Sequence, residues 1–169
     1  MKKFIILALI LVSNSIFSQQ FVVDTFVEKW DNSKTYLVQM AEAMPEDKYD
    51  FKPSEREMSF KEQVLHILEN MDWLSTTYFS KEKYSKSDFS EIKTKEQLIA
   101  QINTSFDASK SKVIANKNID LSEKAAFFAG PKTKLQILNL MQDHVTHHRG
   151  QVIVYLNLCQ VKPPKYVGW

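Results

Sequence analysis

The chain has 169 residues, 44% of them hydrophobic, which is enough for one domain with a full apolar core. Its formal net charge of +2 includes Lys2 and Lys3, in a segment that we expect to be removed, so the remaining chain is close to neutral and gives no indication of nucleic-acid binding. The single cysteine, Cys159, excludes an internal disulfide. Only three glycines occur, which argues against a turn-rich β fold and favours long helices.

The N-terminal segment, residues 1–18, has the features of a secretory signal peptide. It has two lysines at its start, an apolar run that ends at Val12, and a short stretch that ends at the small residue Ser18. The apolar run is too short to span a bilayer. We therefore expect cleavage after Ser18 and a single soluble domain of residues 19–169, exported to the periplasm or the extracellular medium and without membrane contact.

The first helical pattern follows this segment. Apolar residues recur at three- and four-residue steps between Phe21 and Met44, which predicts a helix that Pro45 ends. The charged connector from Pro45 to Met58 is predicted to be a surface loop with a turn around residues 52–54.

A second helix is predicted from Ser59 to about Phe79, because Ser59 and Glu62 have the spacing of a capping box. Its apolar stripe consists of Phe60, Val64, Ile67, Met71, Leu74 and Tyr78. His66 lies about 120° from that stripe at 100° per residue, so periodicity places it at the edge of the buried face. The same strip also contains Gln63, Asn70, Trp73 and Thr77, and Gln63 or Asn70 is a candidate for orienting the His66 ring.

Two more helices complete the predicted elements. A polar connector of residues 80–93 precedes Thr94, which is predicted to cap a third helix over residues 95–117. Pro131 suits the first turn of a fourth helix, which is predicted to run to about Cys159. Four helices of this length indicate an all-α, four-helix bundle. Connectors near a dozen residues can cross a bundle end, so periodicity alone leaves the topology open.

Three of the four histidines lie on the predicted fourth helix. With Ile137 as the reference, His144 and His148 fall within about 20° of the centre of the apolar stripe, and their i, i+4 spacing places both rings on one face. His147 lies about 100° from His148, near the edge of the stripe.

A histidine on an apolar face is most often a core residue with satisfied hydrogen bonds. Burial of two imidazoles costs several kcal/mol unless each ring nitrogen finds a partner, and a shared cation provides one partner for both. On residue patterns alone, a metal site and a hydrogen-bonded core pair are both open.

Three stretches of the chain resemble the DinB-like family of metalloenzymes. These are PEDKYDFKPS followed by MSFKEQVLHILENMDWL, then DHVTHHRGQVIVYLNL, then the terminal VKPP, and they occur in the family's order across residues 45–164. The resemblance implies a bundle of up-down-down-up topology and a divalent transition metal, commonly nickel or zinc, held by three histidines. These map onto His66, His144 and His148. The resemblance is also compatible with a homodimer.

Three neutral imidazoles leave a coordination position for water or a small-molecule substrate, as in catalytic sites. The family includes thiol S-transferases, a thiol-dependent isomerase and hydrolases. Because small thiol cofactors are kept reduced in the cytoplasm, the signal peptide favours a secreted metal-dependent enzyme with hydrolysis as the reaction. The alternatives are a metal-dependent thiol S-transferase and a non-catalytic bundle that binds metal or a partner protein.

The sequence assigns no catalytic residue and no specific substrate. Asn70, Asp143 and Gln151 are candidates for orienting the ligands or carrying protons, although such residues more commonly form surface or bundle hydrogen bonds. His147 has no assigned role.

Overall fold

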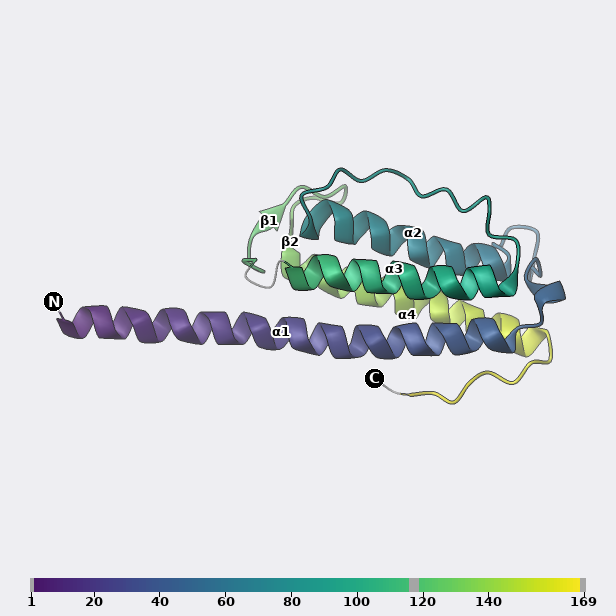
Figure 1. Cartoon of the computed structure of the whole chain (residues 1–169), viewed down its shortest axis with the longest axis horizontal. Helices are drawn as coiled ribbons and strands as arrows, with labels where there is room; N and C mark the ends of the chain where they lie inside the picture. Colours follow the sequence, from purple (N-terminus) through teal and green to yellow (C-terminus); the bar gives the residue numbers. More distant parts are fainter. Residues whose placement is uncertain (1, 116–118, 168–169) are drawn as a thin grey trace.

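The computed structural model describes residues 2–115 and 119–167, with side chains described from residue 19 onward, and in this part of the chain it is a bundle of four long helices (Figure 1). Two short additions lie between them, a single-turn 3₁₀-helix and a two-stranded antiparallel hairpin. The elements are α1 (Lys2–Ala43), η1 (Glu46–Lys48), α2 (Phe60–Phe79), α3 (Lys95–Ala115), β1 (Lys124–Ala125), β2 (Lys132–Thr133) and α4 (Lys134–Leu158).

The helices have up-down-down-up topology, as the resemblance implied. Figure 1 shows α1 and α4 running in one direction and α2 and α3 in the other. Both α1 and α2 contact α3 and α4, so α1 and α2 lie diagonally across the bundle. The connector of residues 80–94 returns along the length of the bundle, which is why the consecutive helices α2 and α3 can be parallel.

Helix α1 begins much earlier than Phe21, the start predicted from periodicity, and runs unbroken from Lys2. Its sequence contains neither proline nor glycine, so no residue interrupts the helical hydrogen bonds. The first part of α1 extends beyond the other three helices in Figure 1. Within the described residues, no helix is both long enough and apolar enough to cross a membrane.

The connector between α1 and α2 is a surface loop, as predicted, since most of its residues are exposed. Its turn is closed by the Glu57 amide, which donates to Ser54 O over 3.1 Å, so the turn lies a little after residues 52–54. Tyr49 is buried, and its hydroxyl donates to Ala41 O at 2.8 Å. An aromatic ring with a polar end can be buried when the hydroxyl finds a partner, and this one fixes the connector against the end of α1.

The start of α2 is confirmed as predicted. The Ser59 hydroxyl accepts from the Glu62 amide at 3.2 Å, and the Glu62 carboxylate accepts from the Ser59 amide at 2.6 Å. This reciprocal pair satisfies two amides that the first turn cannot satisfy internally. Helix α3 begins at Lys95 as predicted, and its expected end at residue 117 lies outside the described residues.

The start of α4 differs from the prediction. The helix begins at Lys134 and not at Pro131, because Thr133 and Gln136 form a second capping box. Residues Lys132 and Thr133 instead form β2, which pairs with β1. Strands of two residues show no recognisable alternation of apolar and polar positions, so the sequence pattern could not predict them.

In the core, α1 packs against α3. Trp30 is fully buried, its indole nitrogen donates to Phe106 O at 3.1 Å, and its ring stacks on Phe26 at 5.1 Å between centroids. A buried indole contributes both apolar area and a satisfied polar group. On the other side of the bundle, α2 contacts α4, and this interface contains the histidines.

Candidate metal centre

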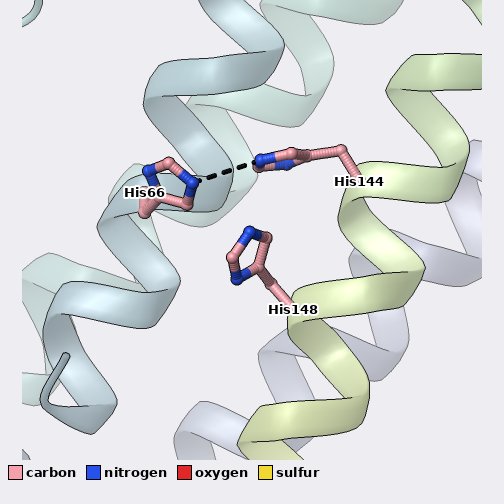
Figure 2. A group of neighbouring side chains, drawn as sticks. All are labelled: His66, His144 and His148. Atoms are coloured by element: carbon pink, nitrogen blue, oxygen red, sulfur yellow. Dashed lines mark hydrogen bonds between the residues drawn. The ribbon is translucent and has the colours of Figure 1, made fainter. Parts of the chain in front are cut away.

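Three histidines meet between α2 and α4. Figure 2 shows His66 projecting from α2 toward His144 and His148 on α4. Each contributes a ring nitrogen, and these three nitrogens lie within 4.8 Å of one another. The closest pair is His66 Nε2 and His144 Nε2, 3.2 Å apart. The structure therefore brings together the three residues that the resemblance had selected.

The orientation of the His148 ring is determined by two glutamines. Its Nδ1 lies 2.7 Å from Gln63 Oε1 and 3.1 Å from Gln151 Oε1. Because both neighbours are carbonyl oxygens, Nδ1 carries the proton and donates it, which leaves the lone pair on Nε2. An imidazole that donates its other N–H to a fixed acceptor is the usual arrangement of a metal ligand.

Gln63 is itself held in place by a chain of hydrogen bonds. Its Nε2 donates to the Tyr155 hydroxyl at 3.2 Å, and that hydroxyl donates to Met58 O at 2.8 Å. The amide of Gln63 therefore cannot reverse without losing both partners, and its oxygen remains directed at His148.

The environment keeps the three imidazoles neutral. The pKa of His144 is lowered to about 3, mainly by burial and also by the nearby His148 and His66, because adjacent positive charges repel. Burial also lowers the pKa of His148 and of His66, the latter against the opposing effect of the Glu69 carboxylate. Neutral imidazole is the state that binds a metal ion, so these rings need not lose a proton at neutral pH.

The donor set fits a divalent transition metal. Two imidazole nitrogens at 3.2 Å need a proton or a cation between them, since two lone pairs would repel. Nitrogens bound at about 2.0–2.1 Å to a tetrahedral zinc ion lie about 3.3 Å apart, which matches this pair. His144 Nδ1 is buried and has no hydrogen-bond partner among the described residues. Nickel, zinc, iron and manganese all accept imidazole, so the ligand type does not select the metal.

The other candidate residues have different positions. Gln151 contacts His148, and Asn70 lines a cleft beside His66. Gln63, one of the two candidates for orienting His66, contacts His148. His147 is exposed and lies 3.3 Å from the Gln151 amide nitrogen. Asp143 lines a separate cavity with Phe127 and Lys132.

Three further residues surround the same cleft, namely Glu69, Trp73 and Tyr84, and sequence reasoning gave none of them a role. The available signal was the polar strip of α2 that contains His66, because Trp73 lies two turns further along it. Tyr84 lies in the connector of residues 80–94, and no helical periodicity could connect it with this site.

Comparisons with known proteins agree with this architecture. A DinB-like protein from Bacillus cereus superposes with a TM-score of 0.73 at 15% identity, covering 85% of this chain and 96% of that chain. A DinB-like protein from Bacillus subtilis gives 0.66 at 18% identity, covering 84% and 96%. At these identities the similarity establishes the fold. Among curated proteins none matches significantly. The model of the DinB family matches residues 15–167, and the chain therefore belongs to the DinB family.

Proposed function

We propose that this protein is an exported metal-dependent enzyme, with His66, His144 and His148 as the ligands of one divalent ion and hydrolysis as the reaction. The observation that carries this proposal is the convergence of three neutral imidazole nitrogens from two helices within 4.8 Å. When bound by three imidazoles, a divalent ion keeps a position for water and lowers the pKa of that water toward neutrality.

The chain's own groups provide orientation around the ligands. Gln63 and Gln151 accept the Nδ1 proton of His148 and direct its other nitrogen toward His66 and His144. Asn70 has a buried carbonyl oxygen with no partner among the described residues, and it lines the cleft that opens beside His66. A substrate in this cleft lies next to a ligand and meets an acceptor for a hydrogen-bond donor of its own. We place this enzyme outside the cytoplasm because of the signal-like residues 1–18.

The first test is the metal content of the protein purified without a histidine tag. We expect about one equivalent of transition metal in the parent and none in the triple variant His66→Ala, His144→Ala, His148→Ala. The matched control is His147→Ala, which removes an exposed histidine of the same helix and should retain the metal. A parent that takes up no divalent ion, or a control that loses as much metal as the triple variant, would contradict the metal site.

The second test identifies the reaction. Metal-dependent turnover in a panel of esters, amides and phosphoesters would support hydrolysis. Metal-dependent consumption of a small thiol with an electrophilic acceptor would support thiol transfer instead. A metal-loaded protein inactive in both panels would favour a bundle that binds metal without catalysis.

A further inference from the structure

A cleft with a volume of about 340 Å³ adjoins the three histidines. It is lined by His66, Glu69, Asn70, Trp73 and Tyr84, the first four from α2 and the last from the connector of residues 80–94. This volume lies at the lower end of the range for small-molecule sites. His66 belongs both to the lining of the cleft and to the group of three histidines, so the cleft is adjacent to the proposed metal site.

Hydrogen-bond acceptors of the cleft have unused capacity. Asn70 Oδ1 is buried and has no partner among the described residues. Glu69 Oε1 accepts from the Tyr84 hydroxyl at 3.2 Å, whereas Glu69 Oε2 lies 3.9 Å from Lys86 Nζ, beyond hydrogen-bond distance. A buried acceptor without a donor destabilises a protein unless a ligand or water supplies one. The cleft is therefore suited to a ligand that carries N–H donors.

The cleft also contains two aromatic side chains beside the Glu69 carboxylate. The Trp73 ring is stacked with Phe127 and Phe128, at centroid distances of 6.1 and 6.4 Å. These contacts hold the indole in one orientation. Tyr84 is held through its hydroxyl by Glu69. Aromatic faces together with a carboxylate attract organic ammonium groups through the ring quadrupole and the negative charge.

An ammonium group already lies near this position. Lys86 Nζ is 3.9 Å from Glu69, but the Lys86 side chain is 79% exposed. An exposed ion pair at such a distance contributes little stability, so a ligand can replace the lysine without a large cost.

We propose that this cleft binds an organic ammonium group attached to an apolar or aromatic body. Glu69 and Asn70 accept its N–H donors, Trp73 and Tyr84 contact its body, and the remainder of the molecule extends to His66. The substrate class of the enzyme is thus a primary amine. This inference rests on the proposed function only where it states that the bound ligand is presented to the metal site.

The test compares three probes of similar shape and different charge, namely 2-phenylethylammonium, 2-phenylethanol and 3-phenylpropionate. Binding to the purified protein at pH 7.5 is followed by the NMR signal of the Trp73 indole N–H. We expect the ammonium to bind about tenfold more tightly than the alcohol, and the carboxylate to bind most weakly. Equal affinity for all three probes, a preference for the carboxylate, or no binding up to the solubility limit overturns the proposal.

Two variants assign the preference to Glu69. Glu69→Gln should weaken ammonium binding about tenfold and leave alcohol binding unchanged, whereas Lys86→Gln should tighten ammonium binding. The matched control is Glu57→Gln, which removes the same charge from an exposed loop. Equal effects of Glu69→Gln and Glu57→Gln would mean that only net charge matters, and would overturn the proposal.

Metal content measured on the same samples distinguishes a failure of the ammonium-binding proposal from a failure of the proposed metal-dependent enzyme. Metal uptake without an ammonium preference overturns the ligand assignment and leaves the metal site standing. An ammonium preference in a protein that takes up no metal supports the cleft and contradicts the proposed enzyme.

Discussion

The orientation of His148 depends on hydrogen bonds to single neighbouring residues. His148 is 8% exposed, and its Nδ1 proton is held by the carbonyl oxygens of Gln63 and Gln151. Its neighbour His144 has no such partner for Nδ1 among the described residues. These two histidines of α4 therefore differ, since His148 is oriented through its Nδ1 by the glutamines, whereas His144 is oriented through its Nε2, which lies 3.2 Å from His66 Nε2.

We expect Gln63→Leu to weaken zinc affinity by about 10- to 100-fold, because the change keeps the volume but removes an acceptor from His148. Competition with a chelating dye measures the affinity. Gln63→Glu should retain binding, since a carboxylate also accepts the proton. Gln101→Leu on α3 is the control, and a Gln63→Leu protein with parental affinity would show that Gln63 does not orient the ligand.

The stability of the metal-free protein should depend on the protonation of His144. Its pKa of about 3 in the folded protein lies below the ordinary 6.5, so between these values the unfolded chain binds more protons. The free energy of unfolding is then highest above pH 6.5 and falls as the pH is lowered toward 3.

Urea unfolding at pH 7.5 and pH 5 measures this dependence. We expect His144→Gln to lose less stability than the parent between the two pH values, and His147→Gln to lose as much as the parent. A His144→Gln protein with the parental loss would mean that other groups carry the pH dependence.

Sequence patterns predicted His144 and His148 better than His66. The first two lie in the centre of an apolar stripe, where the helical period detects them. His66 lies at the edge of the α2 stripe because it faces the space between two helices and not the centre of the core. Only the motif resemblance selected it, and no pattern could connect Tyr84 with it.

At the scale of elements, capping boxes determine where the two helices that carry the three clustered histidines begin. The spacing of Ser59 and Glu62 predicts the first box, whereas the box of Thr133 and Gln136 has the same spacing and lies just after Pro131, the predicted start of α4. The parallel arrangement of α2 and α3 was not predictable from periodicity, because a connector of a dozen residues permits either direction.

Thr133→Ala should lower the free energy of unfolding by about 1 kcal/mol, because it removes the cap of α4. Thr104→Ala, in the exposed middle of α3, is the control and should be neutral or slightly stabilising, since alanine favours helix. Urea denaturation compares the two, and equal losses would contradict a capping role for Thr133.

At the scale of the whole molecule, α1 has two parts. Its N-terminal part projects beyond the bundle, whereas Gln19 already contacts it, with its side-chain oxygen accepting from the Leu121 amide at 3.1 Å. Removal of residues 1–18 should leave the bundle intact.

We expect the exported protein to begin at Gln19, because the basic start and apolar run have the form of a cleaved signal. Intact-mass spectrometry of the extracytoplasmic fraction measures this. Leu9→Arg should block export by interrupting the apolar run. A full-length protein that remains inside the cell would contradict the proposal.

The separation of the three histidines along the chain has a consequence for stability. His66 and His144 are 78 residues apart, and α3 and the hairpin lie between them. A permanent cross-link that closes a loop of this length removes unfolded-state disorder equivalent to about 4.5 kcal/mol in the chain-entropy model. An ion shared by these residues would act as a reversible staple of the same kind. The resistance of the fold to unfolding and proteolysis would then follow the metal supply of its surroundings.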